Sequence, residues 1–95
     1  MEQPSPTRTP LAELLFRHVD MLAGVIGPRH PRKPQTMTAT AGYIEAQLMD
    51  LDLTVTRESF RVHNQPTDNV IATIIGTHAP NEIVILGAHY DSTST

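Results

Sequence analysis

Two almost continuous apolar runs constrain the fold of this 95-residue chain more than any other feature of its sequence. Residues 69–76 read NVIATIIG, residues 83–88 read IVILGA, and the turn-forming sequence GTHAPNE joins them. Strands that show no alternation of apolar and polar residues are usually covered on both faces. We therefore predict a layered α/β fold in which strands occupy residues 69–76 and 83–89.

A first helix is predicted close to the N-terminus. Thr9 can cap this helix, and Pro10 suits its first turn because proline lacks the amide hydrogen that a first turn leaves unpaired. Apolar residues and one histidine then recur at the three-and-four spacing of a helical face: Leu11, Leu14, Leu15, His18, Val19 and Leu22. Gly24 is the predicted end of the helix.

A second helix is predicted after a proline-rich loop. Three prolines fall within residues 28–34, which favours an extended loop, and the basic residues among them indicate a solvated surface rather than a binding patch. The second helix begins near Thr36 or Thr38 and runs to about Leu51. Asp52 follows at the point where the end of a helix favours glycine.

The sequence between the second helix and the first apolar run predicts one more strand. Residues 53–62 read LTVTRESFRV and alternate, but the apolar positions change parity partway along, which indicates a bulge. The sequence NQPTD, residues 64–68, is predicted to be the turn of an antiparallel hairpin between this strand and residues 69–76. We expect the two helices to cover the sheet that the three strands form.

The composition excludes several partners and chemistries. The net charge is −3 and 18% of the residues are charged, so the chain has no broad basic field for nucleic acid or a membrane surface. It has no cysteine, which excludes disulfides, cysteine-ligated zinc and thiol nucleophiles. We predict one domain after a disordered leader at residues 1–9, with no transmembrane segment and no signal peptide, and the compartment stays open.

The second apolar run ends in two residues that can do chemistry, His89 and Asp91. Residues two apart on a strand project from the same face, so the Asp91 carboxylate can approach the imidazole of His89. A carboxylate bonded to one ring nitrogen orients the ring and raises the basicity of the other nitrogen, as a metal ligand requires. A purely structural hydrogen-bonded pair has the same spacing, so the residues alone leave both interpretations open.

The segments around this pair resemble the N-terminal part of the aminopeptidase-like zinc metallopeptidases (peptidase family M28). The resemblance covers residues 11–95, and residues 69–92 are its most specific part. The similar segments are IGPR, AGYIEAQLMDLDLTV, SFRV, NVIATIIG and EIVILGAHYDST. One departure is Asp52, where the family usually has glycine.

This resemblance implies a particular fold. The expected architecture is the N-terminal part of a three-layer phosphorylase/hydrolase-like (zinc exopeptidase) fold, with two helices followed by three strands. Residues 10–95 would then be an incomplete N-terminal portion of a peptidase catalytic domain. In that fold a later strand lies between the strands expected at residues 69–76 and 83–89, and a local hairpin between these two is the competing outcome.

The resemblance also implies a function and a cofactor. His89 matches the first zinc-ligating histidine of the family, and Asp91 matches the catalytic carboxylate that tunes it. The complete enzyme would use two zinc ions to cleave a peptide substrate near its free amino terminus, with its general base and further ligands beyond Thr95. On this expectation the chain is an N-terminal fragment that is inactive on its own.

Two other interpretations of the same residues stay open. Glutaminyl cyclases, which are acyltransferases, are similar in fold and have a similar histidine–aspartate strand end with one zinc ion. Alternatively, the chain is a non-catalytic interaction module in which His89 and Asp91 are structural. The coding sequence beyond Thr95 tests these interpretations, because further aspartate, glutamate and histidine ligands are expected there for an enzyme and not for an interaction module.

Overall fold

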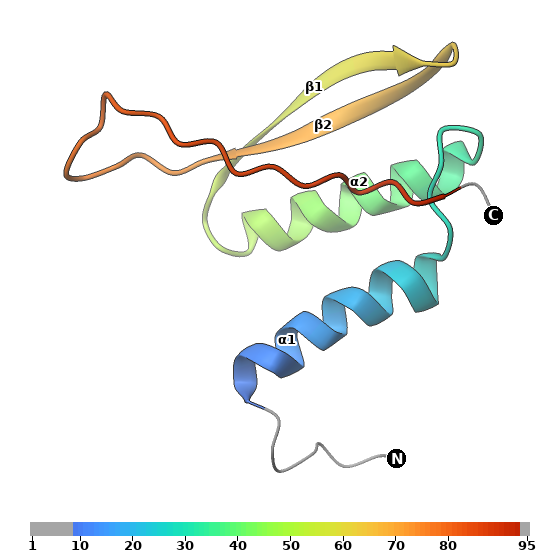
Figure 1. Cartoon of the computed structure of the whole chain (residues 1–95), viewed down its shortest axis with the longest axis horizontal. Helices are drawn as coiled ribbons and strands as arrows, with labels where there is room; N and C mark the ends of the chain where they lie inside the picture. Colours follow the sequence, from blue (N-terminus) through green and yellow to red (C-terminus); the bar gives the residue numbers. More distant parts are fainter. Residues whose placement is uncertain (1–8, 94–95) are drawn as a thin grey trace.

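The computed structural model, which describes residues 9–93, shows a mixed α/β fold of two helices and one two-stranded antiparallel sheet (Figure 1). The predicted leader lies outside the described residues except for Thr9. The elements in chain order are α1 (Pro10–Val19), the π-helical segment η1 (Asp20–Ile26), α2 (Pro34–Met49), β1 (Thr54–Val62) and β2 (Gln65–Thr73). Among the described residues, no helix combines the length and the apolar character that crossing a bilayer requires.

The predicted start of α1 is confirmed, whereas its predicted end is wrong. The Thr9 hydroxyl accepts a hydrogen bond from the amide of Ala12, at 3.1 Å, so Thr9 caps the helix as expected. Gly24 does not end it, because the chain continues as η1 with wider π-helical turns. The terminating residue is Gly27, which has a φ of 84° and donates its amide to the carbonyl of Leu22.

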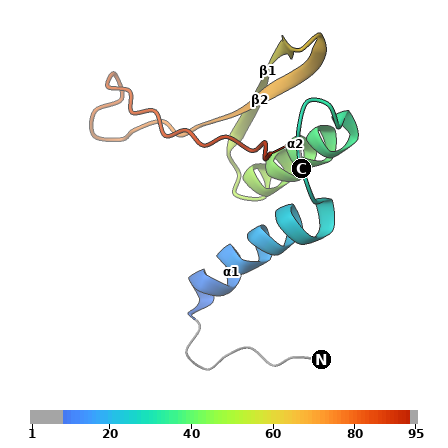
Figure 2. The same cartoon turned by 45° about the vertical axis from the view of Figure 1, so that its right-hand side comes forward.

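Only one of the two helices covers the sheet, so this part of the prediction is wrong for α1. Within the described part of the chain, α2 packs on β1 and β2, whereas α1 contacts neither strand. Figure 2 shows α1 projecting away from the hairpin, and its apolar side chains, such as Leu11 and Val19, stay exposed. His18 links α1 to α2, because its Nδ1 atom lies 2.5 Å from the Tyr43 hydroxyl and the two rings meet edge to face.

α2 begins earlier than the sequence predicts and carries most of the buried residues of the described chain. Pro34 occupies its first turn, where the missing amide hydrogen has no helical partner to lose, so the proline starts the helix rather than delaying it. Met37, Thr40 and Ala41 are buried on this helix. The Thr40 hydroxyl donates to the carbonyl of Thr36 at 2.7 Å, which satisfies a buried polar group.

At the end of α2, Asp52 occupies the position that favours glycine, as the sequence predicts. The helix ends at Met49, two residues before the predicted end, and Asp52 has a φ of 60°. The amide of Leu53 donates to the carbonyl of Leu48, and the amide of Asp52 donates to that of Met49. This pair of hydrogen bonds is a Schellman motif, in which the left-handed position favours glycine and tolerates aspartate.

The hairpin forms as predicted, but its turn is shorter and it has no bulge. His63 and Asn64 make a two-residue turn with φ values of 49° and 64°, which suits the twist of an antiparallel pair. The predicted turn at residues 64–68 is therefore wrong, since Gln65 already pairs with Val62. Pairing continues without interruption to Thr54 opposite Thr73, which also contradicts the predicted bulge.

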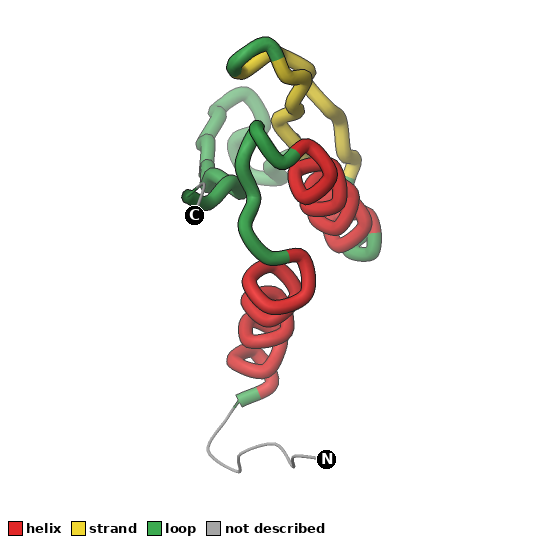
Figure 3. The backbone as a smooth tube through the Cα atoms, turned by 90° about the vertical axis from the view of Figure 1, so that its right-hand side faces the viewer, coloured by secondary structure: helices red, strands yellow, loops and turns green. Residues whose placement is uncertain are grey.

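The third predicted strand is not formed among the described residues. β2 ends at Thr73 rather than at residue 76, the chain reverses, and residues 83–89 run back without strand pairing (Figures 1 and 3). Leu86 is 97% exposed. An extended segment becomes a strand only beside a hydrogen-bonding neighbour, and no described strand lies next to this one. The competing local hairpin between residues 69–76 and 83–89 is also absent from the described chain.

Replacement of Asp52 by glycine is expected to stabilise the fold by up to about 1 kcal/mol, because glycine adopts the left-handed conformation without a steric penalty. Asp50, at the same helix end, has a right-handed φ of −64° and provides the matched control. Asp50→Gly is expected to lower the free energy of unfolding by about 0.5–1 kcal/mol. Urea unfolding followed by far-ultraviolet circular dichroism measures both changes, and a shift of the same sign in the two variants would contradict this account.

Candidate functional site

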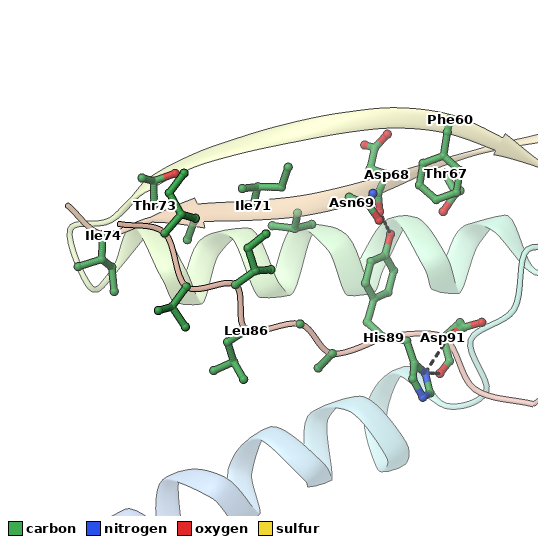
Figure 4. Close-up of a pocket in the computed structure, with 18 of the residues that line it drawn as sticks. Phe60, Thr67, Asp68, Asn69, Ile71, Thr73, Ile74, Leu86, His89 and Asp91 are labelled. Atoms are coloured by element: carbon green, nitrogen blue, oxygen red, sulfur yellow. Dashed lines mark hydrogen bonds and ion pairs between the residues drawn. The ribbon is translucent and has the colours of Figure 1, made fainter. Parts of the chain in front are cut away.

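The structure brings the two predicted site residues together. The Nδ1 atom of His89 lies 2.9 Å from a carboxylate oxygen of Asp91 and 3.1 Å from the main-chain carbonyl oxygen of the same residue (Figure 4). The His89 side chain is 86% exposed and that of Asp91 is 48% exposed. The hydrogen bonds of His89 to other described residues all use Nδ1, so Nε2 is the ring nitrogen left for a ligand.

The residues on either side of Asp91 anchor this segment to the rest of the fold. The Tyr90 hydroxyl donates to the main-chain carbonyl of Asp68 on β2, at 2.6 Å. The Ser92 hydroxyl accepts from the amide of Arg29, at 2.7 Å. His89 therefore sits on a short stretch that is held by β2 on one side and by the loop before α2 on the other.

Arg29 is the site residue that the sequence analysis missed. Its Nε atom donates to the main-chain carbonyl of Tyr90 at 2.7 Å. Its Nη1 atom donates to the carbonyls of Leu22 and Gly27, at 2.6 and 2.9 Å. The prediction of a solvated basic loop is thus wrong for this arginine, which is half-buried and joins the end of η1 to the segment that carries His89.

An open groove separates β2 from the returning segment. Its volume is about 940 Å³, and residues 67–75 line one side while residues 82–91 line the other. Ile71 and Ile74 belong to the β2 side, and Leu86, on the opposite side, points away from β2 (Figure 4). The groove ends at His89 and Asp91, so the predicted pair lies at one end of a largely apolar channel.

A charged network that joins the hairpin to α2 adjoins the anchor at Asp68. Arg57 contacts the carboxylate of Glu45 at 2.5 Å and that of Asp68 at 2.9 Å, and the Ser59 hydroxyl donates to Asp68 at 2.7 Å. The hydrogen bond from Ser59, followed by that from Arg57, lowers the pKa of the Asp68 carboxyl below its ordinary value. Hydrogen bonding to Glu45 is the largest cause that raises the pKa of Arg57.

The described residues contain one candidate ligand pair and no larger cluster. No group of three histidine, cysteine, aspartate or glutamate side chains within residues 9–93 is arranged to hold a metal ion. His18 packs against α2, as its place on the apolar helix face predicts. No protein-family model, curated protein or solved structure matches this chain significantly.

Acidification is expected to weaken the hairpin through Asp68. Because the pKa of Asp68 is lowered in the fold, its stabilising contribution is complete above the ordinary carboxyl pKa of about 4 and is lost as the pH falls through the lower, folded value. Asp68→Asn is expected to reduce this acid-dependent loss of stability. The measurement is the thermal unfolding midpoint as a function of pH.

Glu82→Gln provides the control for this experiment, because Glu82 is an exposed carboxylate in the turn after β2. It should leave the acid profile of the wild-type chain intact. An Asp68→Asn profile that coincides with the wild-type profile would contradict the role assigned to Asp68.

Proposed function

We propose that this chain is the N-terminal part of the catalytic domain of a zinc-dependent exopeptidase of the aminopeptidase type, in which His89 is a zinc ligand and Asp91 orients it. The observation that carries the proposal is the 2.9 Å contact between His89 Nδ1 and the Asp91 carboxylate, in an imidazole that is exposed. The resemblance of residues 69–92 to aminopeptidase-like zinc peptidases supplies the reaction class.

The pair has the chemistry that a histidine ligand needs. A proton on Nδ1 is donated to Asp91, which fixes the tautomer and leaves the lone pair of Nε2 free for a metal. The negative charge of the carboxylate makes Nε2 a better donor to a cation. The three hydrogen bonds that anchor the segment through Tyr90, Ser92 and Arg29 support this role, since a ligand must be held in place before the metal arrives.

Zinc fits the pair but requires more ligands than the described residues supply. A catalytic zinc site uses about three protein ligands and keeps one position for water or substrate. Residues 9–93 contribute one candidate histidine, so the proposal requires further ligands from outside this range. Bound zinc would supply Lewis-acid polarisation of a carbonyl and activation of water. The chain's own part is to present an oriented imidazole.

The groove supports the proposed fold. β2 pairs with β1 along one edge only, so its other edge faces the groove with backbone groups available for pairing. Residues 83–88 form the opposite side and are likewise unpaired within the described chain. The expectation that a further strand lies between the two segments accounts for an apolar sequence that is exposed over Ile83–Leu86.

The first test is zinc binding by the 95-residue chain and by two histidine variants. The chain is expected to bind zinc weakly, because it supplies one imidazole, and zinc should shift the nuclear magnetic resonance signals of the His89 ring. His89→Ala should abolish this binding, whereas His78→Ala, a control in the exposed turn after β2, should leave it unchanged. Binding that survives His89→Ala would overturn the assignment of the ligand.

The second test is hydrolysis of an amino-acid anilide by the complete product of the gene. Asp91→Asn should lower kcat/KM by about 10- to 100-fold, the usual effect of removing a residue that orients a metal ligand. His89→Ala should lower it further, because it removes the ligand itself. A complete product with no metal-dependent hydrolysis and no effect of either substitution would favour the non-catalytic interaction module.

A further inference from the structure

We propose that Arg29 is the positioning residue of the His89–Asp91 pair, holding the segment that carries the pair against the end of η1. The inference rests on the proposed function only in treating His89 as the ligand, and the anchoring itself is independent of any metal. The hydrogen bonds of His89 and Asp91 to each other are local, and local contacts alone leave a segment free to move as a unit.

The chain before His89 does not fix the position of the histidine. Residues 83–88 are unpaired, and Leu86 is almost fully exposed, so no sheet ladder within the described chain fixes the approach to the histidine. The fixed points come immediately afterwards, at Tyr90 and Ser92. Any group that holds these two residues therefore sets where the imidazole is presented.

Arg29 holds both of them and uses its main chain as well as its side chain. The guanidinium Nε donates to the Tyr90 carbonyl, while the Arg29 amide donates to the Ser92 hydroxyl. In return, the Ser92 amide donates to the Arg29 carbonyl at 2.5 Å. The Ser92 hydroxyl also donates to the Arg29 carbonyl, at 3.3 Å. Four hydrogen bonds thus join one residue to a segment about sixty positions further along the chain.

The other end of the guanidinium fixes Arg29 itself. Nη1 donates to the carbonyl of Leu22, within η1, and to that of Gly27, which directly follows η1. The Leu22 carbonyl already accepts from the Gly27 amide, so the guanidinium adds a second donor to it. The C-terminal end of a helix carries partial negative charge, so a cation is well placed there. The planar group therefore reaches in two directions at once, with Nε toward Tyr90 and Nη1 toward η1.

This arrangement requires arginine rather than any cation. Guanidinium donors have a fixed planar geometry, whereas lysine has one compact ammonium at the end of a flexible stem. Lysine at this position would keep the charge at the end of η1 but would lose the simultaneous reach to Tyr90. Arg29→Lys is consequently the informative substitution, because it separates the geometry of the side chain from its charge.

Tyr90 provides a second anchor of one side-chain hydrogen bond, and its removal gives a smaller change with which the effect of Arg29→Lys can be compared. Its hydroxyl donates to the Asp68 carbonyl on β2, so Tyr90→Phe removes one hydrogen bond and leaves Arg29 in place. The matched control is Arg32→Lys, in the same loop, where the side chain is exposed. The three variants together distinguish the effect of losing the Arg29 side-chain anchor, the effect of losing the anchor to β2 and the general effect of a lysine in this loop.

The experiment measures amide hydrogen exchange and backbone heteronuclear nuclear Overhauser effects in the metal-free 95-residue chain. Arg29→Lys removes the Nε hydrogen bond to the Tyr90 carbonyl and keeps the main-chain bond of the Ser92 amide. It is therefore expected to ease opening of the whole segment and to speed exchange of the Ser92 amide by about tenfold, the factor that corresponds to roughly 1.4 kcal/mol. It should also increase the fast motion of the His89 backbone. Tyr90→Phe should produce a smaller change, and Arg32→Lys should produce none.

Two outcomes would overturn the inference. One is an Arg29→Lys chain in which exchange at Ser92 and motion at His89 match the wild type. The other is an equal loss of protection at every amide, hairpin included, because a residue that only supports the whole fold would act in that way. Addition of zinc to the same samples separates the two proposals: a wild-type chain whose His89 ignores zinc contradicts the ligand assignment, while the metal-free exchange data still decide the role of Arg29.

Discussion

The course of the chain after β2 depends on where its backbone amides and carbonyls find hydrogen-bond partners. β1 and β2 satisfy each other along the full length of the hairpin, but residues 83–89 have no neighbouring strand in the described structure. Such a segment is fixed only where side chains and loop carbonyls hold it. Here the fixed points are Tyr90 and Ser92, so the placement of His89 follows from hydrogen bonds to Arg29 and to the Asp68 carbonyl of β2 rather than from strand pairing.

Signals that act over a few residues predicted much of the fold. The cap at Thr9, the left-handed residue at Asp52 and the hairpin all follow from local chemistry, and the structure contains each of them. The errors arose where a residue tolerates more than one structure. Gly24 continues into π-helical turns, and Pro34 starts a helix instead of delaying it. The third strand depends on a neighbour, and the sequence of residues 83–89 contains no information on whether one is present.

In the candidate site, too, the local contact could be predicted from the sequence and the long-range contact could not. The contact between His89 and Asp91 could be predicted because residues two apart share a face even without a formal strand. Arg29 could not be assigned from the sequence, since it contacts Tyr90 across 61 positions and stands among basic residues that face solvent. The same limit applies to α1. Its exposed leucines follow a helical spacing, and such spacing predicts that one face is covered without identifying what covers it.

Residues 74–88 form a loop whose two ends are held independently, by the hairpin at Thr73 and by the anchors at Tyr90. The length of such a loop affects mainly the entropy of closing it, which rises by only about 0.6 kcal/mol for each doubling. The exposed turn at residues 77–82 can therefore accept inserted residues without displacing the imidazole. Homologous chains that differ in length at this turn are expected to keep the same histidine, aspartate and arginine in register.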